Sequence, residues 1–319
     1  MLKKLIMETN QIVNCVNIAY IFKTSLGSIN GSWTEGNVST VKKITLPNGA
    51  QLPYVSGQSI KYQIRKAWKE MGLEDLLSEV KQAEKKAGVD FTSGEPNLYL
   101  DDDLLGYMIA STGENRRRTA VVRTSAAIGL FPFRNDRDLG TKSKEQTGGD
   151  VSAGGNIFET EIYYNYFRVN ILVELDRLGV FQDFELAKAN KGKVQSLTPQ
   201  EKRERLIYLL RALSHIWGGG KQSRLLTDMS PKFLAITFQN VKSPIFLETL
   251  TVSENEELNT KTINEVLSGN SGIIEKQLLG FQSGIFKNDD AISLLPEITN
   301  IQTAFENAVE YINNELFQQ

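Results

Sequence analysis

Two hydrophobic periodicities alternate along the chain, and their order leaves few folds open. A period of two indicates a strand, and a period near 3.6 indicates an amphipathic helix. Strand-like stretches cover residues 16–26, 119–130, 158–175 and 233–238, and helix-like stretches cover residues 56–71 and the segment from 198 onward. This order predicts an α+β fold on the split βαβ, ferredoxin-like βαββαβ plan. Many functions use that plan, and the basic-Gly-aromatic signature of the RNA recognition motif (RRM) is absent from the third strand.

Capping signals mark the start of both helices. Ser56 can accept a hydrogen bond from the first turn of the helix over residues 56–71. Thr198-Pro199-Gln200-Glu201 is a capping box with proline at the first helical position. These signals support both helix assignments independently of the hydrophobic pattern.

Three stretches lie outside the βαββαβ pattern of strands and helices. Residues 72–118 form an insertion after the first helix, in which short helices are expected. Residues 134–157, between the second and third strands, are polar and rich in glycine. Residues 241–319 follow the last core strand, and we expect this acidic segment to be mostly helical and to pack on the core.

The residue counts exclude several classes of site. Cys15 is the one cysteine and His215 the one histidine, so an intrachain disulfide, a Cys-rich zinc site and a multi-His metal site are all excluded. No apolar run reaches the roughly 18 residues of a membrane span, and the first ten residues make a poor signal peptide. We therefore expect a cytoplasmic protein without a membrane partner.

The run Asp101-Asp102-Asp103 is the most serious candidate for a metal site. Three carboxylates could hold a metal ion for nuclease chemistry. They also favour the N-terminus of a helix, which is the interpretation we prefer here. His215, beside Trp217, is expected to pack against its neighbours. We therefore expect no catalytic residue, no metal and no cofactor.

The formal net charge of −2 hides a gradient along the chain. Residues 1–70 hold nine Lys and Arg against three Asp and Glu, whereas residues 251–319 hold three against eleven. A basic N-terminal part suits a polyanionic ligand such as a nucleic acid, and the acidic C-terminal part does not.

The first helix carries Lys61, Arg65 and Lys69 at four-residue spacing, opposite its apolar stripe. Side chains at this spacing lie above one another, so they form a continuous basic ridge. Ser56-Gly57-Gln58 begins the helix, where free backbone N–H groups favour an anion. The alternative is a solvated helix face with a routine cap.

Other basic residues occur next to glycines or in runs. Gly218-Gly219-Gly220-Lys221-Gln222-Ser223-Arg224 joins the second helix to the last strand, and its glycines would let the backbone approach a phosphate. It is not a P-loop, because a strand follows it. Arg116-Arg117-Arg118 with Arg123, and Lys42-Lys43, are further positive groups. A flexible connection and a solvated surface are the alternatives for these segments.

A set of short motifs, in order from about residue 16 to 240, resembles the DevR-type backbone subunit of type I CRISPR Cascade surveillance complexes. The segments that carry the resemblance are Ser25–Asn30, Gly36–Ser39, Leu52–Lys61 with Ile64-Arg65, Asp102–Met108, Arg123–Ser125, Glu161–Tyr164 and Gly220–Arg224. The ordered set is fairly specific.

The resemblance implies a modified RRM palm over residues 1–71 and 119–240, a finger-like insertion over 72–118 and a β-hairpin thumb over 134–157. It implies that copies assemble head-to-tail into a helical filament along the CRISPR RNA. The thumb of one copy reaches over its neighbour, and the guide pairs with target DNA in short segments. Other Cascade subunits are the further partners.

The resemblance and the basic groups together give the expected contacts. The expected thumb residues are Arg134, Asn135, Arg137, Thr141 and Lys142. The expected RNA-binding residues are Gly27, Ser28, Asn30, Lys42, Lys43, Ser56, Gly57, Gln58, Lys61, Arg65, Arg116, Arg118, Arg123, Gly219, Gly220, Lys221, Gln222 and Arg224. A carrier of any guide should use phosphate contacts and backbone donors, because base pairing supplies the sequence specificity.

The competing hypothesis is an RNA-guided or repeat-processing endoribonuclease on the same fold. Related backbone subunits of another CRISPR class cut target RNA with a loop aspartate. The matching loop here offers Ser28, Asn30 and Ser32 but no aspartate, which argues against cleavage. Repeat-processing nucleases often use histidine, and His215 is poorly placed for that role.

Overall fold

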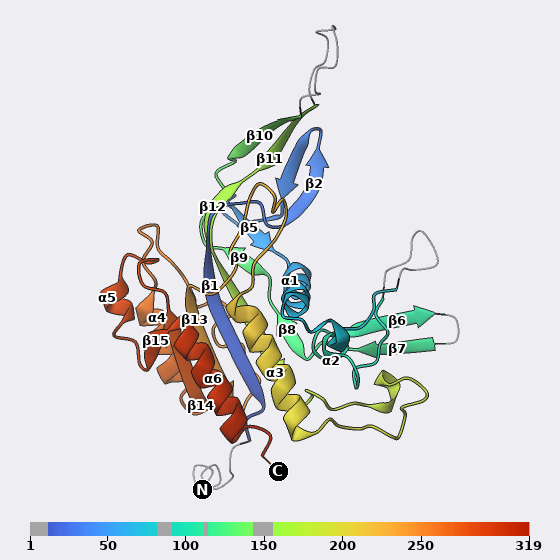
Figure 1. The fold of residues 1–319 in the computed structure, drawn as a ribbon. Coiled ribbons are helices and arrows are strands. Elements are labelled where there is room, and N and C mark those ends of the chain that lie inside the picture. Colours follow the sequence, from blue (N-terminus) through green and yellow to red (C-terminus); the bar gives the residue numbers. More distant parts are fainter. Residues whose placement is uncertain (1–11, 82–90, 112–113, 143–155, 319) are drawn as a thin grey trace.

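A large mixed sheet forms the centre of the computed structural model, which describes residues 12–81, 91–111, 114–142 and 156–318 (Figure 1). Among these residues, nine strands belong to this sheet. Eight of them follow one another in the order β15 (Ile298–Asn300), β14 (Ile274–Phe281), β13 (Phe233–Gln239), β1 (Cys15–Gly27), β12 (Tyr163–Glu174), β9 (Ala127–Gly129), β5 (Gln51–Val55) and β4 (Lys43–Thr45). The ninth, β8 (Val122–Thr124), also pairs with β12.

The four core strands expected from the sequence are neighbours in this sheet. β1 lies between β12 and β13 and runs antiparallel to both. The expected strand over 119–130 is divided into β8 and β9, because the chain gains one residue relative to β12 between Thr124 and Ile128. The mixed α+β class is thereby confirmed.

Three helices cover one face of the large sheet. They are α1 (Gly57–Glu70), α3 (Pro199–Ser214) and α6 (Ile301–Glu315) (Figure 1). Ser56 caps α1, and Thr198 with Glu201 forms the capping box of α3, as the sequence predicts. Val16, Ile18, Tyr20 and Phe22 of β1 are fully buried against this layer. None of the helices in the described ranges is long and apolar enough to cross a bilayer.

The C-terminal segment covers the opposite face and also extends the sheet. Its helices α4 (Thr260–Gly269) and α5 (Asp289–Ile292) pack there with Ala19 and Ile21 of β1. Beside the helices expected for this segment, it also carries β14 and β15, which continue the large sheet and which the sequence did not predict. Leu278 faces the α1–α3–α6 layer and Leu279 the other core, so β14 is buried on both faces.

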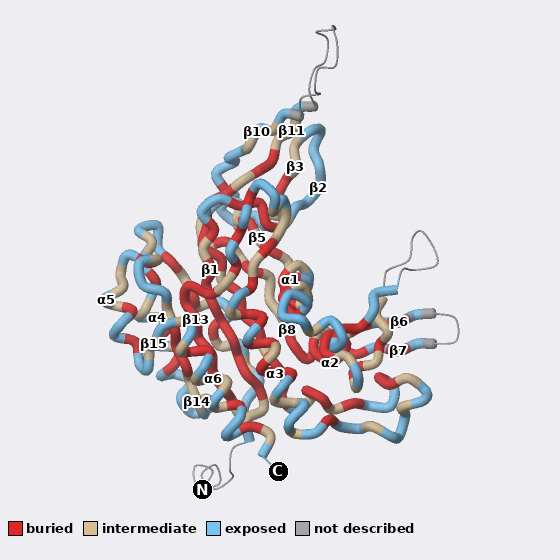
Figure 2. Tube along the Cα trace, in the orientation of Figure 1, coloured by how far each residue is buried: buried red, intermediate tan, exposed pale blue. Residues whose placement is uncertain are grey.

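A second sheet projects beyond one end of the large sheet (Figure 1). Its strands follow the order β10 (Arg137–Lys142), β11 (Asn156–Glu161), β3 (Val38–Val41) and β2 (Gly31–Glu35). β11 leads into β12 through Ile162, so the strand expected over 158–175 is shared between two sheets. Residues 143–155 of the expected thumb lie outside the described residues. Figure 2 shows that much of β2 and β10 is exposed.

The insertion over residues 72–118 carries a hairpin that the sequence did not predict. β6 (Tyr107–Ser111) and β7 (Glu114–Arg118) pair in antiparallel fashion. The expected short helices are η2 (Glu74–Leu76) and α2 (Leu100–Leu104). A further short helix, η3 (Asp183–Glu185), lies in the connection between β12 and α3 and contacts β7.

Candidate nucleic-acid interface

Three segments that are far apart in the sequence meet at the junction of the two sheets. The side-chain oxygen Oδ1 of Asn30 accepts a hydrogen bond of 2.9 Å from the backbone N–H of Ser56. The carbonyl of Ile29 accepts a bond of 2.6 Å from the backbone N–H of Gly220. The loop after β1, the start of α1 and the loop after α3 therefore form one surface, which we call the junction surface.

The start of α1 presents backbone donors at this surface. The Ser56 hydroxyl accepts a bond of 3.3 Å from the Ser59 N–H and so caps one of the free backbone donors of the first turn. A Cβ at Gly57 would lie 2.9 Å from the carbonyl oxygen of Thr124, so only glycine fits there without displacing backbone. Gln58 is exposed. This arrangement suits an anion at the helix N-terminus.

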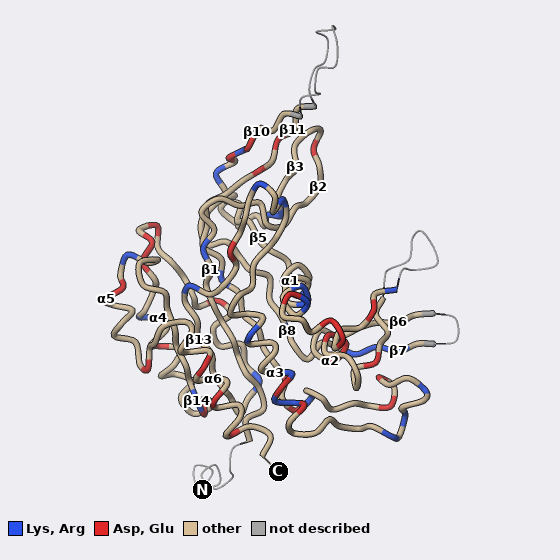
Figure 3. Tube along the Cα trace, viewed as in Figure 1, with Lys and Arg blue, Asp and Glu red and all other residues tan. Residues whose placement is uncertain are grey.

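Lys61 and Arg123 place two cations beside this helix start. Burial lowers the pKa of Lys61, and the positive charge of Arg123 lowers it further. The Lys61 ammonium donates one bond, of 3.2 Å, to the Leu105 carbonyl. Arg123 pairs with Glu174 at 3.1 Å and keeps 52% of its side chain exposed. An anion between them would relieve their repulsion. Figure 3 shows the cluster of basic residues on α1.

The glycine loop after α3 binds the second sheet. Gly219 has a φ of +113° and packs so closely on Ile29 that a Cβ would lie 2.7 Å from a methyl group of that residue. Lys221 also has a positive φ, +59°, which is uncommon for a residue other than glycine. Its ammonium donates a bond of 3.1 Å to the Ser39 hydroxyl on β3. The loop is thus held against both sheets and is more than a flexible connection.

Other residues of this loop also form hydrogen bonds and an ion pair. Arg224 donates to the Thr160 hydroxyl at 3.0 Å and pairs with Asp138 at 3.1 Å. Gln222 donates to the Gly219 carbonyl at 3.1 Å and accepts from Lys66 at 3.4 Å. These contacts fix the shape of the loop and leave the Lys221 ammonium exposed at its edge.

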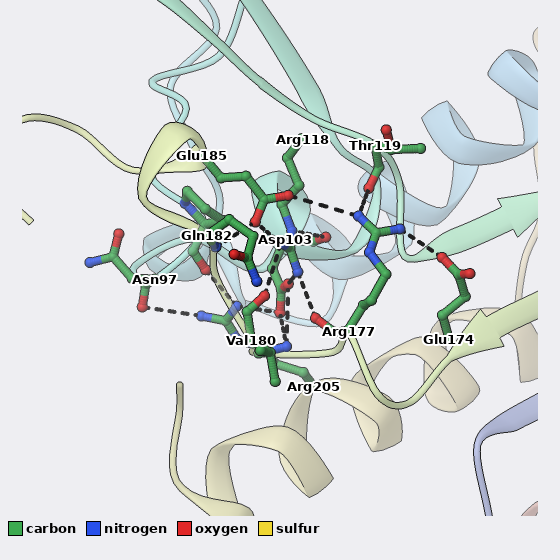
Figure 4. Close-up of polar contacts among 12 residues, drawn as sticks. Asn97, Asp103, Arg118, Thr119, Glu174, Arg177, Val180, Gln182, Glu185 and Arg205 are labelled. Atoms are coloured by element: carbon green, nitrogen blue, oxygen red, sulfur yellow. Dashed lines mark hydrogen bonds and ion pairs between the residues drawn. The ribbon is translucent and has the colours of Figure 1, made fainter. Parts of the chain in front are cut away.

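Two of the expected RNA-binding arginines lie inside the protein instead. Arg118 is buried, and it pairs with Asp103 at 2.6 Å and with Glu185 at 2.8 Å (Figure 4). Arg116 is buried and donates to the carbonyls of Ser93 and Gly94. The expectation that these two contact RNA is wrong, because alternate residues of β7 point to opposite faces of the hairpin.

Four further residues expected to bind RNA are paired or buried within the protein. Arg65 pairs with Asp101 at 2.7 Å and donates to the Ser78 carbonyl, so it links α1 to the insertion. Lys43 pairs with Glu161 at 2.7 Å. Ser28 and Gly27 are buried. Arg65 and Lys43, both expected to bind RNA, thus each have a carboxylate partner within the protein, whereas Lys42 is half-buried and pairs with no carboxylate in the described ranges.

The aspartate run begins α2, as the helix interpretation predicts. All three carboxylates are buried and bound by the protein: Asp101 by Arg65, Asp102 by Thr92 and the Glu95 N–H, and Asp103 by Arg118 and Arg205. The described residues contain no group of acidic, histidine and cysteine side chains that could hold a metal ion. His215 ends α3 as an exposed residue, so the expectation that it packs is wrong.

The expected thumb residues lie at the base and first strand of the second sheet. Arg134 and Asn135 precede β10 and are exposed. Arg137 pairs with Glu159 across the hairpin at 2.8 Å, and Thr141 lies opposite Ile157. The side chain of Lys142 lies outside the described residues.

The sequence did not identify the hairpin formed by β2 and β3, which supplies Ser39 to the junction surface. Its signal is the two-residue Gly36-Asn37 turn, in which Gly36 has a φ of +63°. Tyr62 is a second residue of this surface that was not among the expected RNA-binding residues. It lies four residues after Gln58 on the same side of α1, and 66% of it is exposed. An exposed aromatic ring there can stack on a base.

Comparisons with known proteins agree on one family. A family model described as the CRISPR-associated negative auto-regulator DevR/Csa2 matches residues 18–256. The CRISPR-associated protein Cas7/Cst2/DevR of Myxococcus xanthus (strain DK1622) is 27% identical over 175 residues, covering 50% of this chain. The matched part spans 58% of that relative's length.

Two solved structures share the fold. A chain of a CRISPR RNA-guided surveillance complex, pre-nicking, has a TM-score of 0.61 at 15% identity, covering 93% of this chain and 100% of that one. A chain of a CRISPR RNA-guided surveillance complex has a TM-score of 0.52 at 18% identity, covering 93% and 98%. At such identities the likeness supports the fold alone. Because the family model matches most of the sequence, this chain belongs to the DevR/Csa2 family of CRISPR-associated proteins.

Proposed function

We propose that this protein is a non-catalytic, CRISPR RNA-binding backbone subunit. Copies of it assemble head-to-tail along the guide RNA, join other Cascade subunits and present the guide for pairing with target DNA. The observation that carries this proposal is the junction surface, where the Asn30–Ser56 and Ile29–Gly220 bonds unite three segments expected to hold RNA.

The chemistry of the junction surface suits a sugar–phosphate backbone. It combines the start of α1, a close glycine loop and the cations Lys61, Arg123 and Lys221. Phosphate contacts fix position without reading sequence. A guide of any sequence can therefore occupy the same surface, and its bases remain available for pairing.

The sheet order supports an RRM-like palm made of β13, β1, β12 and β8 with β9, together with α1 and α3. In this proposal residues 1–71 and 119–240 form the palm, the β6–β7 hairpin belongs to the finger-like insertion, and residues 134–157 form the thumb. The thumb is wider than a single hairpin, because β2 and β3 join it in one sheet.

The geometry of the first-strand loop supports a role without cleavage. Ser28 is buried, and the Asn30 side chain is held by the Ser56 N–H. Neither is placed as a general base. Incubation of the purified protein with guide and complementary RNA in magnesium should therefore leave both strands intact, and site-specific products would favour the endoribonuclease hypothesis instead.

A salt titration of RNA binding tests the proposed surface. Asparagine tolerates a positive φ, so Lys221→Asn removes the charge while keeping the backbone conformation. We expect the log–log salt slope to flatten by about 0.7 for one lost phosphate contact on a single strand. The loss should be equal on two guides of unrelated sequence.

Lys69→Asn is the matched control. Lys69 is exposed in the last turn of α1, away from the start of the helix. This variant should keep the slope of the unchanged protein. An unchanged slope in Lys221→Asn, or a loss confined to one guide, would place the RNA on a different surface.

A further inference from the structure

The glycine loop over residues 218–224 begins and ends at a short ladder of backbone contacts. Trp217 pairs with Asp228 in an antiparallel bridge, and the backbone N–H of Gly218 donates a bond of 3.0 Å to the Thr227 carbonyl. Ordering the residues between these two ends costs conformational entropy. The shape of the loop therefore depends on the contacts that it makes with other elements.

On the side of α1, Lys66 contacts the loop at two points. Its ammonium lies 3.7 Å from the centre of the Trp217 ring, where the loop begins, and donates a bond of 3.4 Å to the side-chain oxygen of Gln222. The Gln222 amide in turn donates to the Gly219 carbonyl at 3.1 Å. Since Gly219 packs against Ile29 of the junction surface, these contacts connect Lys66 to that surface.

Glu70 fixes the lysine and the indole ring together. One of its carboxylate oxygens pairs with the Lys66 ammonium at 3.4 Å, and the other accepts a bond of 2.9 Å from the Trp217 ring N–H. Lys66 and Glu70 are one turn apart on α1, so both face the loop from the same side of the helix. The indole ring is thus held at its face by a cation and at its edge by a carboxylate.

The second sheet supports the opposite side of the loop. The Lys221 ammonium donates to the Ser39 hydroxyl on β3. The Arg224 guanidinium donates to the Thr160 hydroxyl on β11. The loop therefore lies between α1 and the second sheet, and without Lys66 it would lose a support on the side of α1.

We propose that Lys66 and Trp217 are positioning residues for guide binding, because they hold the glycine loop in the shape that presents Lys221 to a phosphate. Three groups of the protein already occupy the Lys66 ammonium, so it acts through the loop. The inference rests on the proposed function and adds that this part of the junction surface is ordered before RNA arrives. A surface already in its bound shape binds more tightly, since less conformational entropy is lost on binding.

A double-mutant cycle tests this role. Lys66→Met keeps the aliphatic stem and removes the cation, and it should weaken guide binding about three- to tenfold. The log–log salt slope should stay that of the unchanged protein, because the complex contains the same phosphate contacts. In the Lys221→Asn background, Lys66→Met should weaken binding by about twofold at most, since the loop then has no ammonium to present.

Three further variants give the matched comparisons. Lys66→Arg keeps a cation over the Trp217 ring and should bind guide RNA like the unchanged protein. Lys69→Met removes an exposed charge from the same helix and should also leave the affinity unchanged. Trp217→Leu should repeat the effect of Lys66→Met, because the ring and its N–H are both lost. Circular dichroism checks that each variant folds.

Hydrogen exchange of the RNA-free protein gives a readout that needs no guide. Lys66→Met should speed exchange at the amides of Gly218 and Gly220, whose bonds to Thr227 and Ile29 depend on the shape of the loop. The amides of α3 should keep their rates.

Three results would overturn the positioning role of Lys66. They are unchanged exchange in the loop of Lys66→Met, a flattened salt slope in that variant, and an equal loss of affinity in both backgrounds of the cycle. A flattened slope would mean that Lys66 itself contacts a phosphate. If the unchanged protein binds no guide, the proposed function fails, and the exchange rates still decide whether Lys66 holds the loop.

Discussion

Lys61 lies where two influences disfavour its charged form. Burial lowers its pKa, and Arg123 nearby lowers it again. The sequence placed Lys61 on a basic ridge but could not show this environment, because Leu105 and Arg123 come from other elements. A lysine with a lowered pKa beside a helix start is a suitable group for an incoming phosphate.

The affinity for RNA should depend on pH through Lys61. A bound phosphate raises the pKa of Lys61 again, so the complex holds the proton to higher pH than the free protein does. Affinity should therefore fall as pH rises from neutral toward the ordinary lysine value of 10.5. Binding measured from pH 7.5 upward, on a short guide, checks the sign.

Two variants define the source of that dependence. Lys61→Arg keeps the charge throughout this range and should flatten the pH profile. Lys69→Arg, at an exposed position, should leave the profile of the unchanged protein. Affinity that is constant with pH in the unchanged protein would mean that Lys61 does not contact the RNA.

At the scale of elements, a buried network of charges fixes the insertion over residues 72–118 to the helix layer. Asp103 of α2 pairs with Arg118 of β7 at 2.6 Å and with Arg205 of α3 at 2.7 Å (Figure 4). Arg118 also pairs with Glu185 of η3. Each charge in this network has an opposite charge beside it, so the complete network can be buried. Removal of one member would leave a buried charge without full compensation and would destabilise the protein.

Arg118→Met should destabilise the protein by about 3–5 kcal/mol, because it removes the cation that the buried carboxylates of Asp103 and Glu185 share. Arg117→Met changes the neighbouring, exposed residue and should stay within about 0.5 kcal/mol of the unchanged protein. Urea unfolding of the two variants measures the difference. Equal stabilities would show that the network contributes little to holding the insertion.

At the scale of the whole molecule, each face of the large sheet carries a hydrophobic core, and both cores contain residues from both ends of the chain. Ala19, Ile21 and Phe233 of the first and last core strands are buried under residues of the acidic C-terminal segment. That segment also covers the edge of β13 with β14. The charge gradient therefore does not mark separate domains, since the acidic part completes the sheet that the basic part begins.

Removal of residues 241–319 should consequently prevent folding. The shortened chain would expose the apolar residues that α4 and α5 cover on the large sheet. It would also expose the unpaired edge of β13, and both changes favour aggregation. A chain that ends at Phe317 is the matched control and should remain folded. Soluble yield and circular dichroism give the comparison, and a soluble, folded product ending at residue 240 would contradict this account of the core.

The sequence by itself determined the elements whose signals are local. The period of β1, the Ser56 cap of α1 and the capping box at Thr198 each depend on residues within a few positions, so they were predicted correctly. The order of the short motifs was likewise enough to indicate the family, and the family model confirms it. The order of β13, β1 and β12 follows from the same local signals, because few arrangements bury their apolar faces.

Only the tertiary structure decided which charges remain available and which pair inside. Arg116 and Arg118 looked like surface cations, and yet alternation along β7 turns both inward while Arg117 faces out. Ser39 meets Lys221 across 182 positions of sequence, a distance at which no local pattern carries information. Burial of a charge depends on partners brought together by folding, because only a specific opposite charge or carbonyl repays the loss of water.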